Sequence, residues 1–180
     1  MSTILSTGVQ PRAWIGCLEC YNNGRLTGDW YDADVAGLVT PEDLHGRPTS
    51  HEELWVFDHE NFHGVLDGEH SPHEAAEIAE VLADLSEDET GAFAAWVDTF
   101  GEQSSRTRWV EKFREDYRGF HDDEADFTRH WFEETSSPEE VARLTEWPYR
   151  DIDWEYASHE LFTGGFHAEN APGGIWVFCA

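Results

Sequence analysis

The sequence runs for 58 residues, from Pro48 to Ser105, without a single Lys or Arg. Fifteen carboxylates fall within this stretch: Glu52, Glu53, Asp58, Glu60, Asp67, Glu69, Glu74, Glu77, Glu80, Asp84, Glu87, Asp88, Glu89, Asp98 and Glu102. Aromatic residues such as Trp55, Phe93 and Trp96 are interleaved with the acids, which a disordered acidic tail would lack. Because a one-signed surface repels itself and destabilises a compact state, we expect the charge to serve a function.

The composition of the whole chain extends this imbalance. The 180 residues include 38 acids and 11 bases, for a formal net charge of -27. Such a charge excludes direct binding to DNA, RNA or an anionic membrane, all of which require basic surfaces, and indicates a basic partner. No secretory leader pattern and no run of about 18 apolar residues is found, so we expect a soluble cytoplasmic protein. Three cysteines do not form a disulfide framework.

The first third of the chain has the pattern of a small antiparallel sheet. Residues 12–20 alternate as a strand does, Asn22-Asn23-Gly24 is a turn signal, and 25–31 can form the returning strand. A third strand is predicted at 54–57, preceded by a short helix that starts at Thr40-Pro41. These elements predict an α+β unit of about 65 residues.

The rest of the chain is mainly helical in pattern. Capping signals at Ser71/Glu74, Ser86/Glu89 and Ser137/Glu140 each precede apolar residues at helical spacing. Helices are predicted over 71–85, 86–100, 105–117, 122–135, 137–147 and 153–162, with a final strand over 175–178. Because an elongated body lowers charge repulsion, we expect an extended shape. Four aromatic residues are assigned to the core or to a dimer contact: Trp109, Phe113, Phe127 and Trp131.

The acids of the first long helix form a stripe. Glu74, Glu77, Glu80 and Asp84 are three, three and four residues apart, or about 4.5–6 Å along a helix axis. B-DNA carries one negative charge per ~1.7 Å, so a dimer of this chain would match the charge of roughly 90 Å of duplex. The stripe therefore suggests carboxylates that stand in for phosphates. Two alternatives are a merely solvated acidic surface and a salt-adapted acidic domain, whose acids would be scattered evenly.

The only cluster of bases follows the acidic stretch. It consists of Arg106, Arg108, Lys112, Arg114 and Arg118, with acids interspersed. We expect these bases to form internal ion pairs or to hold acidic segments together.

Five segments in order resemble the ArdA family of antirestriction proteins. Tyr21–Asp32 is similar to a Y-N-x-G-x-L-x-G-x-W-x-D signature, and Glu53–Gly64 to an E-x-W-x-x-x-D-x-x-x-F segment. Phe113–Phe127 resembles Y-x-G-x-x-x-S-x-E-D-F, without its Ser. Ile152–Leu161 resembles Y-I-D-W-x-x-x-A-x-D-L, and Gly174–Phe178 resembles the family's G-x-Y-V-F ending.

The resemblance implies an elongated α+β body of three small domains that dimerises through its C-terminal part. The corresponding ranges are 1–66 for the N-terminal antiparallel domain, 67–103 for a helical middle domain and 104–180 for the C-terminal domain with the dimer contact. It also implies DNA mimicry against Type I restriction-modification enzymes, through the DNA groove of the methyltransferase core, which protects incoming mobile DNA. No catalytic residue, cofactor or metal is implied. The expected mimic surface comprises Glu74, Glu77, Glu80, Asp84, Glu87, Asp88, Asp122, Asp123, Glu124, Asp126, Glu133 and Glu134.

Two motifs offer a different chemistry. His59-Glu60-Asn61-Phe62-His63 matches H-E-x-x-H, in which two His on one helix face bind zinc and the Glu acts as base. A small zinc metallohydrolase is therefore the alternative function, although the motif follows a predicted strand. Cys17 and Cys20 form a C-x-x-C pair inside a predicted strand, and two ligands alone do not close a zinc site. We interpret them as small buried thiols.

Overall fold

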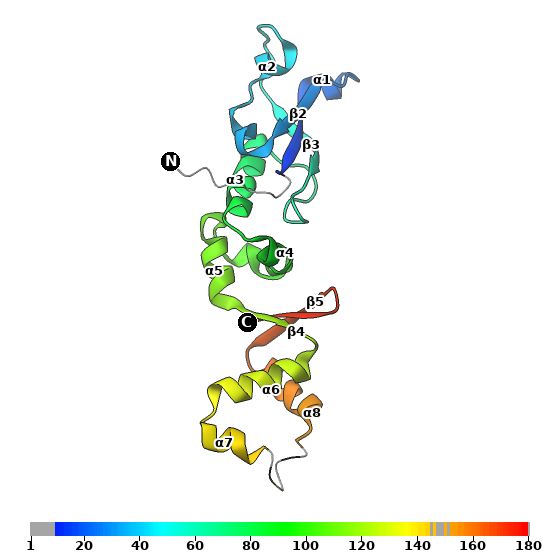
Figure 1. The fold of residues 1–180 in the computed structure, drawn as a ribbon. Coiled ribbons are helices and arrows are strands. Elements are labelled where there is room, and N and C mark those ends of the chain that lie inside the picture. Colours follow the sequence, from blue (N-terminus) through cyan, green and yellow to red (C-terminus); the bar gives the residue numbers. More distant parts are fainter. Residues whose placement is uncertain (1–9, 145, 147–149, 151, 180) are drawn as a thin grey trace, which may run out of the picture. The chain divides into compact units, whose positions relative to one another are not determined.

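The computed structural model describes residues 10–144, 146, 150 and 152–179. The chain divides into two compact units, residues 1–110 and 111–180, with the division inside helix α5 (Trp109–Asp116). Each unit contains one antiparallel sheet together with helices, which confirms the α+β prediction (Figure 1). The division into three domains stays a prediction.

The first unit begins with a three-stranded sheet in the order β2 (Gly28–Asp32), β1 (Arg12–Cys17), β3 (Leu54–Glu60). The three predicted strands are confirmed, but their limits differ. The first strand ends at Cys17, and Cys20 lies in the short helix α1 (Leu18–Asn22), so the prediction of a strand through residue 20 was wrong. Gly24 adopts a φ of 73° in the turn that follows α1 and precedes β2.

Two glycines face each other across β1 and β2. Gly16 pairs with Gly28, and the ring of Trp14 lies over both. A Cβ atom on Gly28 would lie 2.4 Å from the carbonyl oxygen of Ile15 and 2.5 Å from the Trp14 ring. The glycine of the signature segment is therefore required by close packing inside the sheet.

Helices cover this sheet and continue the first unit. The main helix is α3 (Pro72–Ala83), which packs against the 3-10 helix η1 (Ala33–Leu38). The shared core is drawn from the sheet, η1 and α3, and comprises Ala13, Ile15, Ala33, Ala36, Val56, Phe62, Leu66, Ala75, Ile78 and Ala79. The short helix α2 (Pro41–His45) begins with a Thr40/Asp43 capping box and ends at Gly46, which adopts a left-handed φ of 62°.

A second, aromatic cluster completes the first unit. It involves α4 (Glu87–Phe100), the 3-10 helices η2 (Gly101–Gln103) and η3 (Arg106–Arg108), and the start of α5. Phe93 lies 6.2 Å from Trp96 and 6.4 Å from Trp109, measured between ring centroids. The indole N–H of Trp109 donates to the Gly101 carbonyl at 3.1 Å.

The second unit contains a sheet in the order β4 (Tyr117–His121), β6 (Gly174–Cys179), β5 (Phe166–Ala171). Only β6 was predicted from the sequence. The predicted helix over 105–117 is replaced by η3 and α5, and its last residue, Tyr117, opens β4. This sheet is antiparallel throughout.

Three helices accompany the second sheet: α6 (Glu124–Thr135), α7 (Pro138–Arg143) and α8 (Trp154–Thr163). Phe127 of α6 is buried against Phe162 of α8 and Phe166 of β5, at 5.6 and 5.0 Å between ring centroids. The helix predicted to run to Trp147 instead ends at Arg143, with Leu144 as its C-cap residue, and Trp147 itself lies outside the described part of the chain.

Burial agrees with the assignment of three aromatic residues to the core. Trp109, Phe113 and Phe127 are buried, whereas Trp131 is half-buried. Among the described helices, none is both long and apolar enough to cross a lipid bilayer.

Candidate acidic binding surface

The twelve acids expected to form the mimic surface fall into two groups. Four of them are half-buried: Glu74, Glu77, Glu124 and Asp126. Eight are exposed: Glu80, Asp84, Glu87, Asp88, Asp122, Asp123, Glu133 and Glu134. The structure therefore distinguishes acids that are partly buried in the fold from acids that face solvent.

Glu74 and Glu77 have a structural role in α3. The Arg106 guanidinium donates to Glu74 Oε1 at 3.1 Å and to Glu77 Oε2 at 3.2 Å. Glu74 also closes the N-terminal capping box, since its Oε2 accepts from the Ser71 backbone N–H at 3.1 Å. These interactions lower the pKa of Glu74 to about 2. The hydrogen bond from the Ser71 backbone is the largest cause, and the hydrogen bond and charge of Arg106 also contribute.

The depressed pKa of Glu74 predicts a pH-dependent contribution to stability. Because the folded-state pKa lies below its ordinary value of 4.5, the contribution is complete above pH 4.5 and is lost as the pH falls towards 2. Glu74→Gln keeps an acceptor for Ser71 but loses the charge opposite Arg106. Because solvent screens this pair, we expect Glu74→Gln to lower the free energy of unfolding by on the order of 1 kcal/mol at pH 7 and by progressively less at lower pH.

The measurement is urea unfolding of both proteins between pH 7 and pH 3. The control is Glu80→Gln, which removes one charge from an exposed site on the same helix and should not lower the free energy of unfolding, because this charge opposes the helix dipole. A Glu74→Gln deficit that stays constant over this range would contradict the assigned cause.

Acids at the start of α6 also serve the fold. Asp123 caps the helix, since its Oδ1 accepts from the Asp126 backbone N–H at 2.7 Å. Asp126 lies 3.1 Å from Arg129, 3.3 Å from His130 and 3.5 Å from His121, measured from a carboxylate oxygen to a side-chain nitrogen. Negative charge in the first turn of a helix is also favourable to the helix dipole.

Three exposed acids lie where helix electrostatics disfavours them. Glu80 is in the last turn of α3, and Glu133 and Glu134 are in the last turn of α6. Neither turn contains a basic residue, and no salt bridge to these three acids occurs within the described ranges. A negative charge at this end of a helix opposes the dipole by about 0.3–1 kcal/mol. Local stability therefore does not account for them.

The remaining exposed acids lie at helix boundaries. Glu87 and Asp88 occupy the first turn of α4, Asp84 is the C-terminal cap residue of α3, and Asp122 directly precedes the α6 cap. The junction between α3 and α4 thus carries four exposed acids within nine residues, at 80, 84, 87 and 88.

The basic cluster is engaged within the molecule. Besides the Arg106 bridge, Lys112 pairs with Glu115 at 3.0 Å and with Asp116 at 3.4 Å. Arg118 donates to the backbone carbonyls of Glu115 and Tyr117. The expected internal pairing is confirmed for Arg106 and Lys112, and Arg106 additionally holds two acids of α3 together.

The H-E-x-x-H motif does not form a metalloprotease site. His59 and Glu60 are the last two residues of strand β3, and His63 lies in the following turn with a φ of 54°. The motif requires both His on one helix face, which this strand and turn do not provide. The ring of His59 instead packs 5.6 Å from Phe62.

Comparison with known families agrees with the sequence resemblance. A family model for antirestriction proteins (ArdA) matches residues 13–171. The chain belongs to the ArdA family of antirestriction proteins. Among individually curated proteins, none matches it. The ArdA signature segments here serve the fold, since Gly28 lies under Trp14 and Phe62 and Phe127 are buried.

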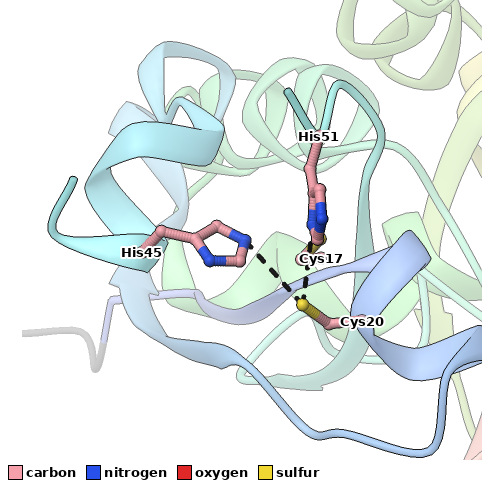
Figure 2. A group of neighbouring side chains, drawn as sticks. All are labelled: Cys17, Cys20, His45 and His51. Carbon is pink, nitrogen blue, oxygen red and sulfur yellow. Dashed lines mark hydrogen bonds between the residues drawn. The ribbon is translucent and has the colours of Figure 1, made fainter. Parts of the chain in front are cut away.

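The sequence analysis missed one group of potential metal ligands in this ArdA chain. The buried thiols of Cys17 and Cys20 lie beside the imidazoles of His45 and His51 (Figure 2). The thiols were predicted to be buried, which is confirmed, but their partners were not predicted. The available signal was the order C-x2-C followed by H-x5-H.

Proposed function

We propose that this ArdA protein blocks Type I restriction-modification enzymes by occupying the DNA groove of their methyltransferase core. The observation that carries the proposal is the set of exposed acids at the C-terminal ends of α3 and α6, where the helices gain nothing from them. A role outside the fold would account for these charges. Basic residues that normally contact DNA phosphates are a suitable partner for them.

The amount of charge is also appropriate. With a formal charge of -27 per chain, a dimer equals the phosphate charge of roughly 90 Å of duplex. We assign the dimer contact to the C-terminal domain, as the family resemblance implies. In this proposal inhibition is stoichiometric and requires no catalytic residue. The partner lies in the cytoplasm, where incoming mobile DNA meets the restriction enzyme.

The proposal predicts competition with DNA that weakens as salt rises. The purified protein is titrated against a Type I methyltransferase core bound to labelled duplex, at about 50 and 200 mM salt. We expect stoichiometric displacement of the duplex at the lower salt and weaker displacement at the higher salt, because screening weakens charge pairing. Two controls are titrated in the same way: buffer without protein, and an unrelated acidic protein of similar pI.

Two outcomes would count against the proposal. If the unrelated acidic protein displaced the duplex at the same concentration, the displacement would be due to non-specific charge and not to mimicry. Absence of displacement by a folded, dimeric preparation would remove the mimic function for that enzyme. A salt-adapted acidic domain would instead unfold at low salt, which circular dichroism of the same samples detects.

A further inference from the structure

Four metal-ligating side chains meet at one end of the N-terminal sheet. They are Cys17, Cys20, His45 and His51, and one ligand atom from each lies within 4.8 Å of all the others. Cys17 Sγ is 3.0 Å from His51 Nδ1, and Cys20 Sγ is 3.6 Å from the same nitrogen and 3.8 Å from His45 Nε2. Figure 2 shows the imidazole of His45 directed at the Cys20 sulfur and that of His51 beside Cys17.

Separate elements of the fold bring these residues together. Cys17 ends β1 and Cys20 lies in α1, so the turn out of the sheet sets the spacing of the two thiols. His45 is the last residue of α2, a helix fixed by its capping box. His51 precedes β3, where the Leu18 N–H donates to the Glu53 carbonyl at 3.0 Å and ties this segment to α1.

We propose that Cys17, Cys20, His45 and His51 form a structural zinc site. With Zn–S near 2.3 Å and Zn–N near 2.0–2.1 Å, the ligand atoms of a tetrahedral site are about 3.3–3.8 Å apart. Two of the three measured distances fall in this range and the third is only slightly shorter. The C-x2-C and H-x5-H spacings also match those of Cys2His2 zinc sites.

The surroundings of His51 add a second feature of zinc sites. Its Nε2 lies 3.4 Å from Glu19 Oε1, while its Nδ1 faces the thiols. An N–H directed at the carboxylate leaves the Nδ1 lone pair free to bind a metal. The His45 and His51 rings are nearly perpendicular, at 86°, with centroids 4.9 Å apart. Two imidazoles in this arrangement can approach one ion from different directions.

The ligand set defines both the metal class and its role. Two thiolates and two imidazoles suit zinc, whereas calcium and magnesium require oxygen ligands. On binding, Zn²⁺ displaces the two thiol protons, which pass to solvent, and the neutral imidazoles give up no proton. All four positions are filled by protein, as in structural sites, so no position remains for substrate. The ion would cross-link the ends of β1 and α2, independently of the proposed function.

The first test is metal content. Untagged protein, expressed with added zinc and purified under a thiol reductant without chelator, is expected to hold about one zinc per chain. Cys20→Ser and His51→Asn should lower this to below about one tenth. Cys179→Ser, which changes the third cysteine, and the double variant His59→Asn/His63→Asn should leave it unchanged. Full occupancy in Cys20→Ser, or zinc loss in the His59/His63 variant, would overturn the proposal.

The second test requires no substitution. Metal-free wild-type protein is titrated with Co²⁺, which should produce thiolate charge-transfer absorption and the visible bands of a tetrahedral site. Addition of one equivalent of Zn²⁺ should abolish both. Thermal melting with and without a zinc chelator should show a lower midpoint for the chelated protein and no such shift for Cys20→Ser. Absence of the cobalt bands together with a chelator-insensitive midpoint would also overturn the site.

Discussion

We expect weaker displacement of DNA from a Type I methyltransferase core when four exposed carboxylates are replaced together by their amides. The four substitutions are Glu80→Gln, Asp122→Asn, Glu133→Gln and Glu134→Gln. An exposed ion pair is worth about 0.2–1 kcal/mol, so four sum to roughly 1–4 kcal/mol. This corresponds to a loss of roughly five-fold to nearly a thousand-fold in apparent affinity. Stability should not fall, because three of the four charges oppose a helix dipole in the free protein.

The matched control neutralises four exposed acids of the N-terminal region, Asp34, Glu52, Glu53 and Glu69. It changes the net charge by the same amount, so equal losses in both variants would show that only total charge matters. Each single change within the first set should reduce competition only slightly, since the charge is distributed. A tenfold loss from one exposed acid would contradict this distributed surface, as would a quadruple variant that competes like wild type.

Sequence reasoning was most successful where two independent signals coincided. Helix α3 has a capping box at Ser71 and Glu74 and apolar residues at helical spacing behind it, and both features are present in the structure. The same holds for α7, whose box joins Ser137 to Glu140. Capping and periodicity are local properties, so a sequence read without its tertiary contacts can reveal them.

The two missed strands depend on contacts that are distant in sequence. Tyr117 continues the helical spacing of Trp109 and Phe113, but it pairs with Phe178 in the sheet instead. Gly119 adopts a φ of 107°, which a helix does not allow. Strand β5 contains few apolar residues and is held by pairing with β6. Tertiary pairing therefore overrode the local pattern in both cases.

The candidate surface shows the same division. The density of acids is a property of composition, and the sequence alone revealed it. The internal pairing of Glu74 and Glu77 depends on Arg106, which lies 32 residues from Glu74 and 29 from Glu77 along the chain. The two histidines beside Cys17 and Cys20 are also 25 to 34 residues away along the chain. A contact between residues so far apart in the sequence is not marked by a local sequence pattern.

The largest loss of stability is expected from Trp96→Ala. Trp96 is 1% exposed and lies 6.2 Å from both Phe93 and Phe100, measured between ring centroids. Truncation leaves a cavity in the aromatic cluster that anchors α4, and changes of this kind typically cost 3–5 kcal/mol, or about half the stability of an ordinary domain. Urea unfolding followed by far-ultraviolet circular dichroism measures the loss without relying on Trp96 fluorescence.

Leu38→Ala serves as the control for Trp96→Ala, because Leu38 belongs to the same unit and is 78% exposed. Its effect should stay within about 0.5 kcal/mol. Trp96→Phe should fall between the two, since it retains part of the buried ring area. A loss below about 1 kcal/mol for Trp96→Ala would contradict the packing described here. Because α4 carries Glu87 and Asp88 in its first turn, the destabilised variant should compete with DNA normally at low temperature and lose competition as it unfolds on warming.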